Sequence, residues 1–446
     1  MIEQARRRQV CLALAGLALG HLVAPPLYAQ TAQEAPAAPE GADAPVATNT
    51  ADAADAALIA RVDAQMTRIL SAYPIPGASI AIAYQGRFVH QRGYGAAVTE
   101  SNTIATAQTR FRIGSVSKAV TAVAVLKLFE KELSQALQSK VFGPDGLLPD
   151  ADFPDFVPRK DPRVLHITLR DLLQHTAGWG GSDYDPQYDL VNIARTMNVP
   201  APAPARAIIA FMLTRRALDA APGTDVFYSN VNYTILGRII ERWSGVPYEQ
   251  AVRDLVWQPA GVTDAVIGAD KRSGRGAGEA VYYDDPRWPA VQEQDGSGNT
   301  GPQAYAGFHF QSMDATAGWV ASALDLVRFA EAALGARMGQ ALLQPASVAL
   351  MTRRNPAMPD NSNGLGWVAT RMQGVEILSH SGALTSGSYA YLQAREDGWT
   401  WAVLFNRLPI PYPPEKGVAQ LQAFQVAVQR GLMAAIIGRP DPVSVP

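Results

Sequence analysis

Two residues with a clear capacity for covalent chemistry, Ser115 and Lys118, stand three positions apart in the segment Arg112-Ile-Gly-Ser115-Val-Ser-Lys118. Residues three apart on an α-helix share a face, so the hydroxyl and the amine should be neighbours. A serine is almost entirely protonated at neutral pH and needs a base before it attacks a carbonyl. A lysine desolvated by apolar neighbours has a lowered pKa and is able to accept that proton. The spacing therefore predicts nucleophilic catalysis with Ser115 as the nucleophile.

The ordinary alternative for this spacing is a serine that caps a helix and a lysine that lies in solvent. The residues after Lys118 argue against it because they leave little polar surface; they are Ala119, Val120, Ala122, Val123 and Val125. A helix that begins at Ser115 also brings partial positive charge and free N–H groups to the place where an oxyanion would form. We therefore expect Lys118 to be buried beside Ser115 at the start of a central helix.

A second set of polar residues, Tyr228-Ser-Asn230, follows the turn Pro222-Gly223 and precedes a helical pattern. A tyrosine near a lysine ammonium can be drawn toward the phenolate and serve as a general base. Asn230 has the groups to orient Lys118 and a substrate amide. Taken alone, a buried tyrosine and a helix-capping asparagine explain this segment more simply. The sequence leaves open whether Lys118 or Tyr228 is the base, because their titrations would be coupled.

The third set, His380-Ser381-Gly382, stands at the end of a predicted strand. A strand edge can bind an extended acyl chain, and a glycine lets the substrate approach closely. The backbone N–H of Ala383 could complete an oxyanion hole with that of Ser115. The alternative is a loop histidine beside a turn. We expect His380, Ser381, Gly382 and Ala383, together with Asn230, to form the substrate-binding and oxyanion groups.

The elements that must position these groups lie at both ends of the chain. Short β-prone runs predict strands at 77–84, 87–93, 365–371, 374–379, 387–394 and 400–406. Helical periodicity appears at 58–70, 116–133, 205–218, 232–243, 248–256, 323–334 and 417–437. The pattern predicts an α+β fold in which one antiparallel sheet, flanked by helices, is built from the N- and C-terminal segments. A mainly helical lobe, at about 134–340, is inserted between them; within it Thr168 and Asp171 predict a capping box, and 268–310 a long loop.

The N-terminal segment, residues 1–29, is typical of a signal peptide, with a positive start at Arg6 to Arg8 and an apolar run from Val10 to Val23. An uncleaved anchor is the alternative. Residues 30–57, rich in Ala and Pro, predict a disordered linker before a catalytic domain at 58–440. We therefore expect a periplasmic or secreted protein. The single cysteine, Cys11, lies in the predicted signal peptide, which leaves the mature chain without disulfides or thiolate chemistry.

Other signals in the chain are weaker. A net charge of −2 provides no basic field, so we expect no nucleic-acid partner. The six histidines form no metal-binding pattern, and we expect neither a metal nor a cofactor. Four aromatic residues either line a cleft or belong to the core: Trp179, Tyr184, Phe308 and Trp319. Three acidic residues predict a solvated loop and not paired catalytic carboxylates: Asp183, Asp185 and Asp189.

Taken in order, these motifs resemble those of the class C β-lactamase and penicillin-binding-protein family. Phe111-Arg-Ile-Gly-Ser-Val-Ser-Lys118 is similar to the nucleophile motif, and Leu172-Leu-Gln-His-Thr-Ala-Gly178 to a signature of the helical lobe. Tyr228-Ser-Asn230 stands where related enzymes have Ser-Asp-Asn, and His380-Ser-Gly382 takes the place of Lys-Thr-Gly. The resemblance spans roughly Leu58 to Ile437 and implies a fold of the β-lactamase/transpeptidase kind.

The resemblance implies a serine hydrolase that acts through an acyl-enzyme on an ester, a D-alanyl peptide or a β-lactam. Its partner would be a small-molecule or peptide acyl substrate, with peptidoglycan as one candidate. His380 replaces a lysine that many β-lactamases use to bind a substrate carboxylate, and histidine is mostly neutral at pH 7. Relatives with histidine there include D-alanyl peptidases and esterases, so the substrate stays open. The alternative from another class is a non-catalytic cell-wall-binding protein that has kept the cleft.

Overall fold

The computed structural model describes residues 50–182, 184–335, 338, 340–355, 363–385, 387–411 and 417–438. The predicted signal peptide, with Cys11, and residues 30–49 of the predicted linker lie outside this part of the chain. Residues 50–57 of that linker begin helix α2 (Thr50–Ala72), so the prediction of disorder was wrong there. Alanine has the highest helix propensity, and this Ala-rich segment extends the amphipathic helix toward its N-terminus.

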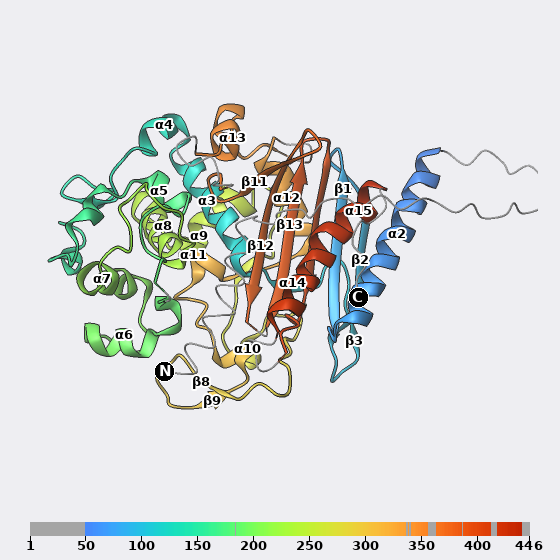
Figure 1. The fold of residues 1–446 in the computed structure, drawn as a ribbon, viewed down its shortest axis with the longest axis horizontal. Helices are drawn as coiled ribbons and strands as arrows, with labels where there is room; N and C mark the ends of the chain where they lie inside the picture. Colours follow the sequence, from blue (N-terminus) through green and yellow to red (C-terminus); the bar gives the residue numbers. More distant parts are fainter. Residues whose placement is uncertain are drawn as a thin grey trace, which may run out of the picture.

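One seven-stranded antiparallel sheet, in the order β11-β12-β13-β14-β1-β2-β3, runs through the molecule (Figure 1). The N-terminal strands are β1 (Gly77–Tyr84), β2 (Arg87–Val98) and β3 (Thr103–Ile104). The C-terminal strands are β11 (Val368–Met372), β12 (Val375–Leu384), β13 (Ser388–Arg395) and β14 (Trp399–Phe405). The two groups join where β1 pairs with β14, with Ala78 opposite Phe405 and Tyr84 opposite Trp399. This sheet confirms the predicted fold class.

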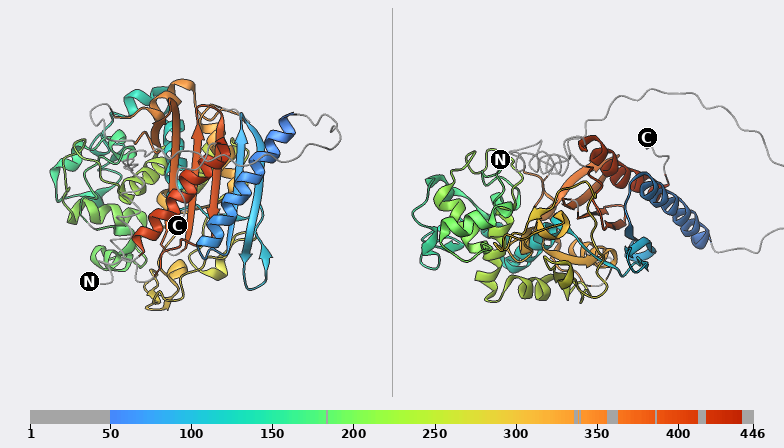
Figure 2. Two further views of the ribbon diagram at one scale, coloured as in Figure 1. Left: turned by 45° about the vertical axis from the view of Figure 1, so that its right-hand side comes forward. Right: turned by 90° about the horizontal axis from the view of Figure 1, so that it is seen from below.

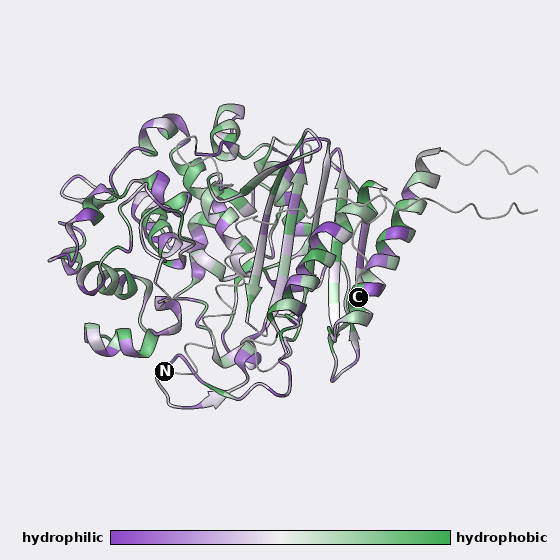
Figure 3. Ribbon diagram, in the orientation of Figure 1, coloured by the Kyte–Doolittle hydropathy of each residue, from purple (hydrophilic) through white to green (hydrophobic). Residues whose placement is uncertain are grey.

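The two faces of the sheet carry side chains of different size. Ile80 and Val403 point to one face and pack with α2, α14 (Val418–Val426) and α15 (Leu432–Ile437). Ala81 and Ala402 point to the other face, where α12 (Ala323–Ala333) packs against β1, β13 and β14. The view from below shows helices on both sides of the strands (Figure 2). Hydrophobic and hydrophilic residues alternate along α2, as expected for a helix with one buried face (Figure 3).

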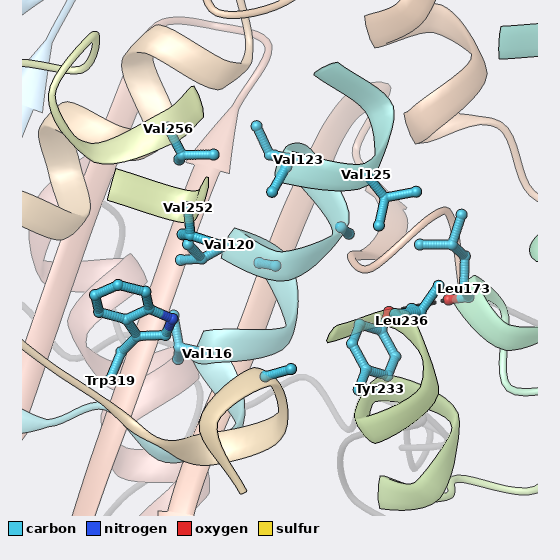
Figure 4. Close-up of a cluster of buried hydrophobic side chains, with 14 of the residues drawn as sticks. Val116, Val120, Val123, Val125, Leu173, Tyr233, Leu236, Val252, Val256 and Trp319 are labelled. Atoms are coloured by element: carbon cyan, nitrogen blue, oxygen red, sulfur yellow. Dashed lines mark hydrogen bonds between the residues drawn. The ribbon is translucent and has the colours of Figure 1, made fainter. Parts of the chain in front are cut away.

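Helix α3 (Ser117–Leu128) is buried on nearly every side. Val120 lies beside Val252, whereas Val125 faces Leu173 and Leu236 (Figure 4). The helix ends before the predicted position 133: a 3₁₀ turn (Glu130–Glu132) and the short α4 (Leu133–Ala136) follow it. Burial on all sides confirms the expectation that this helix is central to the core.

Several further helices gather at one end of the sheet, on the left in Figure 1. They are α5 (Leu169–Leu173), α6 (Leu190–Met197), α7 (Ala205–Arg215), α8 (Asn230–Ser244), α9 (Tyr248–Val252) and α11 (Asp314–Ala317). The capping box of Thr168 and Asp171 is present at the start of α5. Helix α12 falls within the range predicted for the inserted lobe, yet it packs on the sheet; the division into lobes stays a prediction.

The predicted loop at 268–310 contains only short elements, β8 (Val291–Gln292), β9 (Thr300–Gly301) and α10 (Gln303–Ala306). It packs around Arg112, whose guanidinium lies 4.3 Å from the ring centre of Tyr282 and donates to the carbonyl of Ala269 at 2.8 Å. The loop therefore supports the start of the nucleophile motif. Among the described residues, no helix has the length and apolar character needed to cross a bilayer.

Three of the four aromatic residues that the sequence left between cleft and core are core residues, and the fourth packs against the core. Trp179, Phe308 and Trp319 are buried, and the indole N–H of Trp319 donates to the Tyr248 hydroxyl at 3.0 Å. Tyr184 is half-buried and packs beside Phe211.

Candidate active site

The predicted nucleophile, Ser115, lies in a 3₁₀ turn (Gly114–Val116) that leads directly into α3. Gly114 adopts a φ of +51°, which only glycine adopts readily. A methyl group at Gly114 would lie 2.9 Å from the backbone nitrogen of Ala383. One at Gly382 would lie 2.0 Å from the carbonyl oxygen of Ile113. The two glycines thus let β12 cross the turn at close range and bring the Ala383 N–H beside Ser115.

Gly382→Ala should therefore separate β12 from the nucleophile turn and lower kcat/KM by about 100-fold, because a displacement of about 1 Å at a reacting centre has that effect. Gly387→Ala is the matched control on the same hairpin, since a methyl group there makes only ordinary contacts, at 3.6 Å or more. Steady-state kinetics and thermal unfolding of both variants check this prediction. Wild-type kcat/KM in Gly382→Ala would show that the close approach does not matter.

Lys118 is fully buried and lies beside the serine, as predicted. Its Nζ is 3.1 Å from Ser115 Oγ and donates to the carbonyl of Thr316 at 2.9 Å. The ring centres of Tyr228 and Tyr233 lie 5.0 and 5.7 Å from the nitrogen. Burial lowers the pKa of Lys118 to about 7, although the charge of Asp185 acts in the opposite direction. The amine therefore exists in substantial part as the neutral base at physiological pH.

Tyr228 also reaches the serine, with which its side chain forms a hydrogen bond. Burial raises the pKa of Tyr228 above its usual value, and the hydrogen bond with Ser115 opposes that rise only in part. The expectation that the tyrosine is drawn toward the phenolate is thus wrong in direction. The cost of burying a phenolate outweighs the stabilisation that the neighbouring groups give it.

Two histidines flank the lysine. Burial, with the charge of Lys118, lowers the pKa of His380 to about 4, and the same causes place the pKa of His175 well below its usual value. Nδ1 of His380 lies 2.7 Å from the Ser381 carbonyl, which can only accept, so this nitrogen carries the proton. Nδ1 of His175 accepts from the backbone N–H of Ser229 at 3.2 Å. Both imidazoles are therefore neutral near pH 7.

His175 is a site residue that the sequence reasoning did not identify. It belongs to the motif Leu172 to Gly178, but no local feature of that motif indicates its partner. Its ring stacks on Tyr228, with the ring centres 4.5 Å apart. A small pocket next to these rings has uncharged walls. It is lined by Leu173, His175, Tyr228, Tyr233, Asn363, Gly364, Gly366, Trp367, Val368 and His380.

Ser381 contributes its backbone more than its side chain. Residues alternate between the faces of a strand, and Leu378 of β12 packs with the core that contains α3, whereas Ile377 and Ala383 pack with the opposite core. The side chain of Ser381 therefore lies on the opposite face from that of His380, while its carbonyl oxygen accepts the proton of His380 Nδ1.

Asn230, at the start of α8, uses its amide differently from the expectation that it would orient Lys118. Its Nδ2 donates to Asp185 Oδ2 at 2.6 Å. Asp185 is half-buried and its charge acts on Lys118, so the prediction that it belongs to a solvated loop was wrong. The Asp185-Pro186 sequence indicates a helix cap, but no local pattern places that cap near the lysine. Asp183 lies outside the described residues, and Asp189 accepts from the Tyr184 hydroxyl at 2.9 Å.

A second serine beside a possible base is Ser312, whose Oγ lies 2.8 Å from Nδ1 of His309. Nε2 of that ring is 3.6 Å from a carboxylate oxygen of Asp270. Ser312 is buried, however, and its hydroxyl donates to the carbonyl of Ala203 at 2.8 Å. Ser312, His309 and Asp270 therefore form a structural group of polar contacts and offer no accessible nucleophile. Within the described ranges no cluster of three or more His, Cys, Asp or Glu residues could hold a metal ion.

Several known proteins are similar to this chain in sequence or in fold. An esterase, EstB of Burkholderia gladioli, is 31% identical over 269 residues, 55% of this chain and 60% of the esterase. A D-aminopeptidase of Gluconobacter oxydans is 24% identical over 85% of this chain and 69% of that protein. The octameric penicillin-binding protein homologue from Pyrococcus abyssi has a similar fold, with a TM-score of 0.62 over 87% of this chain and 79% of that one, at 22% identity.

The match to the esterase thus spans less than two thirds of that relative's length. The family model described as Beta-lactamase, by contrast, matches residues 56–425, which include the whole sheet and every candidate site residue. This chain belongs to the β-lactamase family.

Proposed function

We propose that this protein is a serine hydrolase that forms an acyl-enzyme on Ser115, with carboxylic esters as its best substrates. The observation that carries the proposal is the buried Lys118 amine, 3.1 Å from the serine hydroxyl and with a pKa lowered to about 7. A base of that pKa is matched to proton transfer near neutral pH. The esterase and the D-aminopeptidase among its relatives support the same class of reaction.

In the proposed acylation, neutral Lys118 takes the Ser115 proton as Oγ attacks the substrate carbonyl. The negative charge that forms on the carbonyl oxygen is held by the N–H groups of Ser115 and Ala383. Tyr228, kept neutral by burial, gives its proton to the leaving alkoxide and regains one from the Lys118 ammonium. Water then attacks the ester on Ser115 and gives a proton to Lys118, and that proton passes to Ser115 Oγ as the acyl–oxygen bond breaks and the acid product leaves. No cofactor takes part in these steps.

The neutral surroundings of the site favour esters over substrates with a carboxylate. β-Lactams and D-alanyl peptides carry a carboxylate that a cation would have to bind. His380, with its pKa near 4, stands neutral where that cation is expected, and none of the residues that line the adjacent pocket is Lys or Arg. A simple ester needs no such partner, because it has no free carboxylate.

We also propose that the protein is exported, to the periplasm or beyond the cell, on the strength of the basic and apolar segment at its N-terminus. Such a location would bring peptidoglycan within reach. D-Alanyl peptides are therefore the second candidate substrate, and a non-catalytic cell-wall-binding role is the alternative from another class.

A panel of three substrates tests the function. Purified protein should hydrolyse a chromogenic butyrate ester with kcat/KM at least about 100-fold above that for nitrocefin or a D-Ala-D-Ala peptide, because a carboxylate left without a partner costs about 3 kcal/mol. The ester is followed by release of its chromophore, nitrocefin by its colour change when the β-lactam ring opens, and the peptide by release of D-alanine. Faster turnover of the peptide would make the protein a peptidase, and no turnover of any substrate would favour the binding role.

A further inference from the structure

Asp185 connects its own segment to α8 and, through Gln187, to the residue that binds the lysine, although it touches none of the reacting atoms itself. It lies just before a short 3₁₀ helix (Pro186–Tyr188), and its Oδ1 accepts from the backbone N–H of Gln187 at 3.0 Å. Its Oδ2 accepts from Nδ2 of Asn230 at 2.6 Å. The carboxylate thus ties its own segment to the first residue of α8, two positions after Tyr228.

A second connection leads from the same segment to the lysine. The side chain of Gln187 donates through Nε2 to Thr316 Oγ1 at 2.6 Å. The carbonyl of Thr316 in turn accepts from Lys118 Nζ at 2.9 Å. Gln187 and Thr316 are both buried, so water does not compete for these bonds. Asp185 therefore holds the turn that carries Gln187, and Gln187 holds Thr316, whose carbonyl accepts from Lys118.

We propose that Asp185 is a positioning residue of the reaction, which holds Asn230 and, through Gln187 and Thr316, the Lys118 amine, and supplies the negative charge opposite that amine. The proposal rests on the proposed function, because it assigns a role in that chemistry. Burial raises the pKa of Asp185, whereas the hydrogen bonds from Gln187 and Asn230 and the charge of Lys118 oppose that rise. In its ionised form the carboxylate can only accept hydrogen bonds, so it also fixes the Asn230 amide with its NH₂ toward Asp185.

The charged and titratable groups around Lys118 make the sign of the effect definite. The charge of Asp185 raises the pKa of Lys118, and burial lowers it. His175, from the segment after α5, and His380, from β12, are neutral near pH 7. Tyr228 and Tyr233 present their ring faces, and Ser115 and Thr316 present oxygen atoms. Among these groups, Asp185 thus supplies the one negative charge that acts on the pKa of Lys118.

Asp185→Asn keeps the shape and removes the charge, so the lysine should lose its proton at lower pH. The acid limb of kcat/KM for the chromogenic ester should move to lower pH, and activity at pH 6, as a fraction of the plateau, should rise at least about twofold. The plateau itself should fall, because Asn230 and Gln187 lose a charged acceptor. Asp185→Glu, which keeps the charge, should restore the wild-type limb.

Asp189→Asn is the matched control, a carboxylate four residues away that accepts from the Tyr184 hydroxyl, and it should leave the limb unchanged. If Asp185→Asn does not fold, Asp185→Ser removes the same charge. An unchanged limb, or one moved to higher pH, overturns the proposal while wild-type ester hydrolysis still stands. A wild-type protein without Ser115-dependent hydrolysis would instead overturn the proposed function.

Discussion

Ser115→Ala should lower kcat for the chromogenic butyrate ester by at least about 1,000-fold and abolish covalent labelling by a fluorophosphonate or a fluorescent penicillin. Loss of a nucleophile removes the covalent path altogether, and what remains is the contribution of the oxyanion groups and of binding. The alanine fits without strain, because Ser115 is half-buried and its hydroxyl bonds only the two groups of the proposed relay, Lys118 and Tyr228, among the contacts described.

Intact-protein mass spectrometry and in-gel fluorescence measure the labelling. Ser312→Ala is the control, because Ser312 lies beside a possible base, His309, yet is buried with its hydroxyl donated to Ala203. That variant should keep both its label and its turnover. Undiminished labelling of Ser115→Ala would place the nucleophile elsewhere and end the proposed mechanism.

The second large effect concerns the base. Since neutral Lys118 is the reactive form, kcat/KM of the wild type should rise with pH through an acid limb near 7, in accord with a pKa lowered by burial to about 7. At one pH unit below the limb, about one tenth of the lysine is neutral, so activity there should be about tenfold below the plateau.

Lys118→Met should lower the plateau by about 100- to 10,000-fold, which is the usual contribution of a general base, and remove the limb. Methionine fills a similar apolar volume at this fully buried position, and the main structural loss is the hydrogen bond to the Thr316 carbonyl, which costs about 1–3 kcal/mol. Thermal unfolding measures that cost separately from the kinetics. A variant that keeps both its rate and its limb would move the role of base to Tyr228.

Much of the site could be predicted from the sequence, because it depends on short spacings. Three residues of helix bring Lys118 to Ser115 whatever surrounds them, and the Thr168–Asp171 capping box is equally local. Short β-prone runs likewise predicted the strands from both ends of the chain, and the apolar run after Lys118 predicted its burial. These features need only neighbours a few positions away.

Only the tertiary structure decided the protonation states of the site residues and the contacts between distant parts of the chain. The pKa of a group depends on every charge near it and on how far the fold buries it. The neutral state of Tyr228, His175 and His380 could therefore be inferred only from the packed site. Asp185 reaches Asn230 across 45 positions of the chain, and Gly382 meets Ile113 from the other end of the sequence. Contacts at such separations are made by the fold, which brings β12, α3 and the helical segments to one point, and no spacing within a motif records them.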